Sequence, residues 1–484
     1  MWECGNVLMW ESSHINNSTN QQINTSTPQH CMRLYNKNIS MLPLVAALLL
    51  SVTVRAADGD TTQRAVRTGW TFGVLPSVAY DADLGLQYGA LTNIYYFGDG
   101  STYPEYLHSI YAEAAYTTSK YGLFRLSYDS RHLIEGLRTS LDITYLPDKM
   151  CDFYGFNGYQ TLYNPSWTNN DDAAYITRAY YKMQRDLFRI AADLQGNIAG
   201  HWYWNAGAGL LNYRIGSVDI DALNRGKKPE NQLPDTTTLY DHYVSAGLIG
   251  SAEKNGGTHP YLHAGITFDS RDRQQNPRRG IHADAFLQYV AAMGDMKDYN
   301  SLKANLTWRH YLPLVANRLT LAYRLGSQLH VAGNSPFYIN TYLNQLYLQR
   351  VIYEGLGGAN SCRGIMRNRI LADGFAFANI ELRIQLVKFK VGKELFYLGI
   401  NPFLDGGMVL QPRMRDELNA ATLLAANGNI DANASIFAPH WAAGCGLKAA
   451  MNDNFVLSID WALALNEQDN AKKSNLYIKM GYMF

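Results

Sequence analysis

The chain has 484 residues, with 42 lysines and arginines against 41 aspartates and glutamates. This balance predicts no polyanionic partner and argues against nucleic-acid binding. The mean hydropathy of −0.23 argues against a bundle of membrane-spanning helices. Tyrosine (34) and glycine (40) are frequent. These averages also fit a transmembrane β-barrel, in which apolar and polar residues alternate.

The N-terminal residues predict export. Residues 32–56 begin with Arg33 and Lys37, continue with an apolar run from residue 42 to 54, and end in small residues. This pattern is typical of a signal peptide cleaved after Ala56, and the apolar run is too short for a membrane-spanning helix. Residues 1–31 are interpreted as an over-extended or disordered leader, and residues 57–83 as a short periplasmic lead-in.

The cysteines of the exported part predict neither a disulfide framework nor a metal site, because they are odd in number and widely spaced. They are Cys151, Cys362 and Cys445. A bridge between Cys151 and Cys362 stays open as an alternative to free buried thiols. No metal and no cofactor are expected.

Period-two alternation dominates the chain after the signal peptide. Around residues 455–465, for example, Phe455, Leu457 and Ile459 share one face, while Ser458 and Asp460 share the other. Runs of ten or more such residues have the length of a tilted strand that crosses the hydrocarbon layer of a membrane. An all-β fold is therefore predicted, namely an antiparallel outer-membrane β-barrel.

The loop lengths alternate between short and long toward the carboxyl end, as in such barrels, where long loops are external. The very long connection at 332–373 is therefore expected outside the cell. Roughly 17 strand-like runs follow from Trp70, but an even number is required if both ends are periplasmic. We expect 16 strands over residues 84–484, with residues 70–80 in the lead-in. The long segment 147–172 conflicts with this count, which places a periplasmic turn there.

Strand parity places two carboxylates in the lumen. On the segment GFAFANIELRIQL, Glu381 alternates with the outward residues Ile380 and Leu382, and Asp405 alternates in the same way with Leu404. A carboxylate facing hydrocarbon would cost several kcal/mol. A lumen of 16 strands is also too wide to be filled by wall side chains.

Four motifs resemble those of the outer-membrane assembly and secretion translocator superfamily, also called the bacterial surface-antigen family. The first three are CRGI with Arg363 and Gly364, ELR with Glu381, and FLDGG with Phe403, Asp405 and Gly407. The fourth is the turn motif of Asp269, Arg271, Asp272, Pro277 and Gly280. Tyr482 and Phe484 resemble the carboxyl-terminal insertion signal of outer-membrane barrels. Cys362 and Ile365 depart from the usual aliphatic and aromatic neighbours of the Arg-Gly pair.

The resemblance implies a 16-stranded barrel whose loop 332–373 folds back into the lumen, with Arg363 pairing to Asp405 or Glu381. It places the protein in the bacterial outer membrane. Relatives carry periplasmic polypeptide-transport-associated domains, for which residues 57–83 leave no room, so a barrel-only branch is indicated.

The expected function is insertion or translocation of proteins or lipids at the outer membrane, and the alternative is a passive channel or surface antigen. Expected partners are outer-membrane lipid and lipopolysaccharide, the barrel-assembly machinery during biogenesis, and a protein or lipid client. An enzyme is not expected. No Gly-x-Ser-x-Gly motif occurs, and His108, His132, His259 and His310 have no recognisable spacing to a nucleophile.

Overall fold

The alternating segments form the strands of a closed barrel in a computed structural model of the chain. The structure describes residues 66–484 except 104, 275, 317, 340–354, 393, 415–416, 419–428, 432, 452–454 and 471–472. The predicted leader, the signal peptide and residues 57–65 of the lead-in lie outside the described residues.

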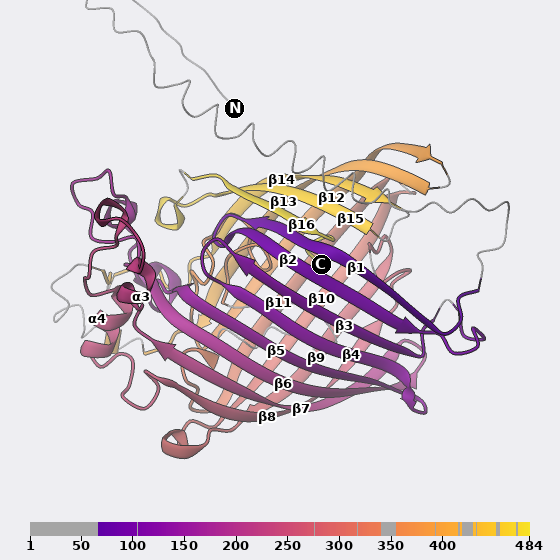
Figure 1. The fold of residues 1–484 in the computed structure, drawn as a ribbon, viewed down its shortest axis with the longest axis horizontal. Coiled ribbons are helices and arrows are strands. Elements are labelled where there is room, and N and C mark those ends of the chain that lie inside the picture. Colours follow the sequence, from indigo (N-terminus) through magenta and orange to yellow (C-terminus); the bar gives the residue numbers. More distant parts are fainter. Residues whose placement is uncertain are drawn as a thin grey trace, which may run out of the picture. The chain divides into compact units, whose positions relative to one another are not determined.

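Sixteen antiparallel strands are present in the described part of the chain, as predicted. They are β1 (Trp70–Asp81), β2 (Gly85–Tyr96), β3 (His108–Thr117), β4 (Gly122–Ile134), β5 (Leu137–Asp152), β6 (Lys182–Ala199), β7 (Trp202–Gly216), β8 (Gly256–Asp269), β9 (Gly280–Val290), β10 (Ser301–Val315), β11 (Leu319–Gly333), β12 (Gly374–Val391), β13 (Glu394–Gln411), β14 (His440–Met451), β15 (Phe455–Ala464) and β16 (Asn475–Met480). Each strand pairs with its sequence neighbours, and β1 closes the barrel against β16 (Figure 1).

The short helices lie in the connections between strands. They are α3 (Ile220–Asn224) and α4 (Leu239–Ser245), with the 3-10 turns η3 (Gly158–Gln160), η4 (Pro165–Thr168), η5 (Pro229–Asn231), η6 (Gly294–Met296) and η8 (Glu467–Asp469). Among the described residues, no helix combines the length and the apolar character that crossing a membrane requires.

The expected start of the barrel at residue 84 was wrong. Residues 70–81 form β1, which pairs with β2 from Trp70 opposite Tyr96 to Asp81 opposite Gly85. These residues alternate like any other barrel strand, and assigning them to the lead-in shifted the count of the following strands. With β1 included, the connection 153–181 lies at the same barrel end as 217–255 and 334–373, so the conflict over residues 147–172 disappears.

The two barrel ends differ in their connections. The long-loop end carries the connections 153–181, 217–255, 334–373 and 412–439, while the turn end carries short ones such as 135–136 and 200–201. α3 and α4 lie at the long-loop end, at the left of Figure 1.

The largest apolar core lies among the long loops. Phe153, Tyr243 and Phe337 come from three different connections and pack edge to face, with ring centroids 5.3 Å apart for Phe153 and Tyr243. Aromatic pairs of this kind stabilise a packed cluster. The loops therefore form a cap whose core is shared with the inner face of β5–β9.

Candidate functional site

Residues 355–373 of the long connection lie inside the barrel and are almost all buried. Bridges between Leu356 and Ile370 and between Gly358 and Cys362 give it local structure. Leu356, Cys362 and Ile370 pack against inward residues of β12 and β13. The loop is thus held to the wall by apolar contacts.

Arg363 lies at the centre of a charged cluster on the barrel wall. Its Nε and Nη2 donate to the two carboxylate oxygens of Asp405 at 2.9 and 3.1 Å, and its backbone N–H donates to Asp405 Oδ2 at 3.0 Å. Its Nη1 lies 2.8 Å from Glu381 Oε1. All three side chains have no exposed surface. The contacts that strand parity and the motifs predicted are therefore present.

Two further residues complete the surroundings of Arg363. Asp460 on β15 accepts from Nη1 at 3.2 Å and also pairs with Lys448 at 2.5 Å. The guanidinium carbon lies 3.5 Å from the centroid of the Phe403 ring. A stacked and bidentate geometry of this kind suits arginine and not lysine. Burial alone would lower the pKa of Arg363, but Asp405 and Glu381 outweigh it and raise the pKa above its ordinary value.

Gly364 brings the loop backbone against β14, β15 and β16. Its φ is +91°, and an added Cβ would lie 2.9 Å from the Cβ of Ala442 and 3.0 Å from the backbone of Leu463. Its N–H donates to the Tyr477 hydroxyl at 3.2 Å, and its carbonyl accepts from Asn475 at 2.9 Å. No other residue adopts this conformation in this space without strain.

The comparisons with known proteins identify the family of the chain. The family model of the Omp85 superfamily domain matches residues 155–484. The chain belongs to the Omp85 superfamily. Omp85 barrels are of the outer-membrane assembly and secretion type, as the motifs predicted.

One solved structure, a BamA barrel, shows the same fold. BamA from Haemophilus ducreyi lacking POTRA domains 1-3 is 14% identical with a TM-score of 0.51, over 86% of this chain and 70% of that chain. CdiB from Acinetobacter baumannii is 12% identical (TM-score 0.44; 87% and 61%), and CdiB from Escherichia coli is also 12% identical (0.49; 84% and 62%). This chain thus spans about three fifths of each CdiB. No curated protein matches the sequence.

The lumenal loop of this Omp85 barrel carries two more buried arginines that the sequence analysis missed. Arg367 donates to Asp148 on β5 at 2.8 Å. Arg369 donates to Asp469 of η8 at 3.1 Å and to the carbonyls of Gly158 and Thr161. The repeated arginines in the segment RGIMRNR are the sequence feature that could have predicted these contacts. The loop therefore crosses the lumen from the β12–β15 wall to β5.

Asp469 joins the loop to the long-loop end. It accepts from His440 at 2.7 Å, and Tyr159 stacks on that imidazole with ring centroids 3.6 Å apart. Burial alone would raise the pKa of Asp469, but His440 and Arg369 outweigh it and hold the pKa below its ordinary value.

Gly407 also belongs to the Arg363 site. An added Cβ would lie 3.0 Å from Leu356 and 3.3 Å from the Cys362 sulfur, so the loop packs closely on the wall at this glycine. Cys151, Cys362 and Cys445 are free thiols, and no bridge joins Cys151 to Cys362. Among the described residues, no group of His, Cys, Asp and Glu is arranged to hold a metal ion.

The turn motif lies away from Arg363, in the β8–β9 connection at the turn end. Arg271 pairs with Asp269 at 2.8 Å, and Asp272 accepts the backbone N–H groups of Arg278 and Arg279. Gly280 has φ +105° and approaches the Ser270 carbonyl too closely for a Cβ. Pro277 is buried within the same turn. These contacts stabilise the turn, which Asn276 also joins to the Tyr397 hydroxyl on β13 at 2.9 Å.

Tyr482 and Phe484, the residues that resemble the insertion signal, lie beyond the end of the final strand. β16 ends at Met480, and Gly481, with φ +85°, turns the last residues inward. There the Phe484 carbonyl accepts from Arg383 at 2.7 Å, and the Tyr482 hydroxyl contacts that of Tyr397 at 3.2 Å. The last residues of the chain thus bond polar side chains in the lumen and do not continue the β-ladder of β16.

Proposed function

We propose that this Omp85 barrel aids the insertion or translocation of proteins or lipids at the bacterial outer membrane, with its long-loop end outside the cell. The observation that carries the proposal is the seam between β1 and β16. Only Tyr80 and Ile478 are paired there among the described residues, whereas β1 pairs with β2 along its full length.

The seam leaves most of β1 as an edge strand. Among the described residues, residues 70–79 of β1 have no paired residue on β16, which is only six residues long. An unpaired edge is a template for another strand, and strand addition is a recurring way to bind an extended polypeptide. A client strand would add to β1 through backbone hydrogen bonds and would reach the membrane sideways.

The lumenal loop favours this sideways route over a pore. Arg363 ties the loop to Asp405 on β13, and Arg367 ties it to Asp148 on β5, so the loop crosses the lumen. Breaking either buried pair would cost several kcal/mol. A client that left through the seam would not have to displace the loop.

A disulfide across the seam tests the proposal. Tyr80→Cys combined with Ile478→Cys would lock β1 to β16, and Tyr80→Cys combined with Leu86→Cys is a matched control because Tyr80 also pairs with Leu86. In a strain that depends on the protein, oxidation of the seam pair should stop growth and lower outer-membrane barrel content, and a reductant should restore both. Full activity of the oxidised seam pair would refute lateral passage.

A passive channel or surface antigen is the competing function. The polar hollow of 430 Å³ near Arg138, Asp269 and Asp284 at the turn end is the feature that favours it. Planar-bilayer recording separates the two functions. A closed loop predicts small, intermittent currents, while large steady currents would support the channel.

We also propose a non-enzymatic role. His108, His259 and His310 each bond a tyrosine hydroxyl, at 2.8, 3.0 and 3.0 Å, and so stand in structural pairs. Outer-membrane lipid, lipopolysaccharide and the barrel-assembly machinery are the partners that this role implies.

A further inference from the structure

A proline, Pro76, lies in the middle of β1, the strand that forms one side of the seam. Proline has no backbone N–H and cannot donate a hydrogen bond to a β-ladder. In sheets it is tolerated where the missing donor faces away from a fully paired neighbour. The direction of its backbone therefore decides which ladder of β1 loses a hydrogen bond.

The hydrogen bonds of β2 show that the backbone of Pro76 faces the seam. The carbonyls of Leu86 and Tyr96 on β2 each accept from an N–H group on the β3 side. Successive residues of a strand direct their backbone groups to opposite sides, so the odd-numbered residues of β2 face β1. The register pairs odd with odd and even with even, as for Pro76 and Ala90. The even-numbered residues of β1 therefore face away from β2 and toward the seam.

β16 leaves the ladder just before it would reach Pro76. Tyr80 lies opposite Ile478. In an antiparallel pair each step back along β1 is a step forward along β16, so Pro76 would lie opposite Tyr482, whose carbonyl would find no N–H there. β16 ends at Met480, two residues earlier, and the chain turns inward. The missing donor of Pro76 thus accounts for the point at which the final strand stops.

Pro76 leaves a short edge on its turn-end side. The backbone N–H groups of Trp70, Phe72 and Val74 face the seam, and none of these residues is paired with a described residue of β16. This edge, residues 70–75, has the length of an ordinary strand of about six residues. An edge of this kind can bind an extended chain by strand addition.

The side chains of the edge define which strand fits. Trp70 ends an outward row of rings that runs through Tyr96, His108 and Tyr128, with neighbouring centroids 4.8, 5.9 and 6.0 Å apart. Phe72 is also outward and exposed. Aromatic and branched apolar residues stabilise cross-strand pairs with such neighbours. The strand that fits therefore alternates, with aromatic or branched apolar residues on the face toward lipid.

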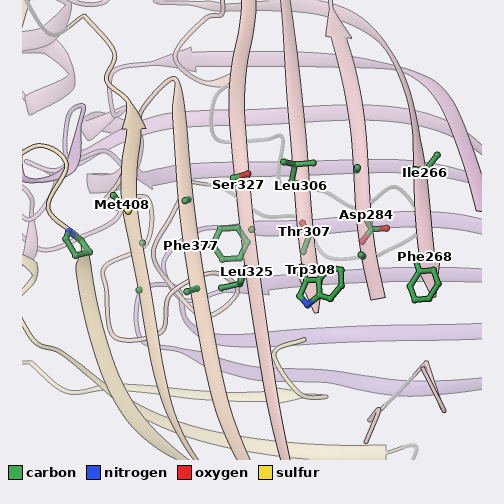
Figure 2. Close-up of a pocket in the computed structure, with 18 of the residues that line it drawn as sticks. Ile266, Phe268, Asp284, Leu306, Thr307, Trp308, Leu325, Ser327, Phe377 and Met408 are labelled. Carbon is green, nitrogen blue, oxygen red and sulfur yellow. The ribbon is translucent and has the colours of Figure 1, made fainter. Parts of the chain in front are cut away.

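The wall far from the seam offers apolar surface without a backbone edge. A hollow of 600 Å³ over β7–β14 is lined by outward residues such as Ile266, Leu306 and Leu325 (Figure 2). Every strand under it is paired on both sides, so the backbone groups there already belong to ladders. Among the described strands, the seam is therefore the place where a client can be recognised through its backbone.

We propose that Pro76 stops β16 from closing over residues 70–75 and so reserves this edge for a client strand of about six residues with an aromatic and apolar outer face. The proposal rests on the proposed function, because it names the docking edge and the kind of strand for lateral passage. The client strand accepts hydrogen bonds from the N–H groups of Trp70, Phe72 and Val74. It ends where Pro76 offers no donor.

A disulfide reporter measures the effect of Pro76 on the last residues of the chain. Leu75→Cys combined with Met483→Cys places two thiols opposite each other if β16 continues along β1. In the chain with Pro76 this disulfide should form poorly on oxidation. After Pro76→Ala or Pro76→Val it should form at least about five-fold more, because either residue supplies the missing N–H. Agreement between the two variants shows that the backbone donor, and not the side chain, is responsible.

Two controls accompany the reporter. Tyr80→Cys combined with Ile478→Cys lies on the other side of the proline and should form a disulfide in every background. Ala90→Val changes the residue paired with Pro76 on β2 without changing a backbone donor, and it should leave the reporter unchanged. All variants carry Cys445→Ala, because that cysteine is exposed.

A synthetic peptide tests the docking edge on the full chain in detergent, with fluorescence anisotropy as the measurement. The probe has about six residues and alternates tyrosine or valine with threonine, and a peptide of the same composition without the alternation is the control. Val74→Pro removes one donor and should weaken binding about five-fold. Pro76→Val should also weaken it, because residues 481–484 then compete for the edge. A peptide of twice the length should bind no more tightly, since the edge ends at Pro76.

The two measurements separate this inference from the proposed function. Equal formation of the disulfide between positions 75 and 483 with and without Pro76 would overturn the role of the proline, even if the peptide binds. No binding of either peptide, with the reporter behaving as expected, would overturn the client edge and refute strand addition as the proposed function. A dimer of the chain joined through β1 would show that a second copy takes the edge, and would also overturn the proposal.

Discussion

Replacement of Arg363 by alanine should be the most destabilising change at the lumenal loop. Glu381 would keep its ion pair with Arg383 at 3.0 Å, and Asp460 would keep Lys448 at 2.5 Å. Asp405 would lose both side-chain hydrogen bonds from Arg363, would keep only the one from the backbone N–H of residue 363, and would stay fully buried. Leaving one member of a buried ion pair unpaired costs about 3–5 kcal/mol.

Urea unfolding in lipid vesicles, followed by tryptophan fluorescence, measures this cost. Arg363→Ala should lower the free energy of unfolding by about 3–5 kcal/mol. The control Arg131→Ala removes an exposed pair with Glu105, 3.5 Å long, and should cost less than about 1 kcal/mol. Arg363→Lys should fall between them, because an ammonium cannot reproduce the forked contact.

A double variant separates charge from simple loss of packing. Adding Asp405→Leu to Arg363→Ala removes the unpaired carboxylate and should recover part of the lost stability. The reasoning is refuted if Arg363→Ala unfolds like Arg131→Ala, or if the double variant is no more stable than Arg363→Ala alone.

Three further predictions concern the loop and its anchors. Gly364→Ala should lower the free energy of unfolding by about 1–3 kcal/mol in the same assay, because residue 364 has a φ of +91° and an added Cβ would press against β14 and β15. Gly392 also has a positive φ but has open space around it, so Gly392→Ala should lower the free energy of unfolding less. Equal losses would contradict the close approach of the loop to the wall. The pKa of Asp469 is lowered in the folded state, so the stability that this carboxylate contributes is present above about pH 4 and is lost as pH falls through the lowered pKa. Limited proteolysis should therefore show the long-loop end opening in acid. Asp469→Asn should remove this pH dependence. In a chain beginning at Ala57, a thiol reagent should label Cys445 alone before unfolding. Cys151 and Cys362 are buried, and burial raises the pKa of the Cys362 thiol. Labelling of either buried thiol in the folded barrel would contradict the packing of the loop.

Strand parity predicted the site well because it is a local property. Once Ile380 and Leu404 are taken as outward, Glu381 and Asp405 must face inward, and both are fully buried in the lumen. The alternation also runs through residues 70–80, but these residues were assigned to the lead-in so that the number of strands would be even. To count the strands one must know which strand pairs with the final strand to close the barrel, and no local sequence pattern marks that strand.

Alternation by itself determined the barrel class and the inward orientation of Glu381 and Asp405, while the pairing of Arg363 with Asp405 or Glu381 was implied by the family resemblance of the motifs. Only the tertiary structure decided that β1 begins at Trp70, that Asp460 shares the guanidinium, and that Arg369 reaches Asp469. It also decided that the chain turns into the lumen after Met480. The physical reason is that a period of two specifies which face a residue takes. Contacts between residues about 100 positions apart, such as Arg363 with Asp460 and Arg369 with Asp469, depend on how the closed barrel and its loop fill one shared space.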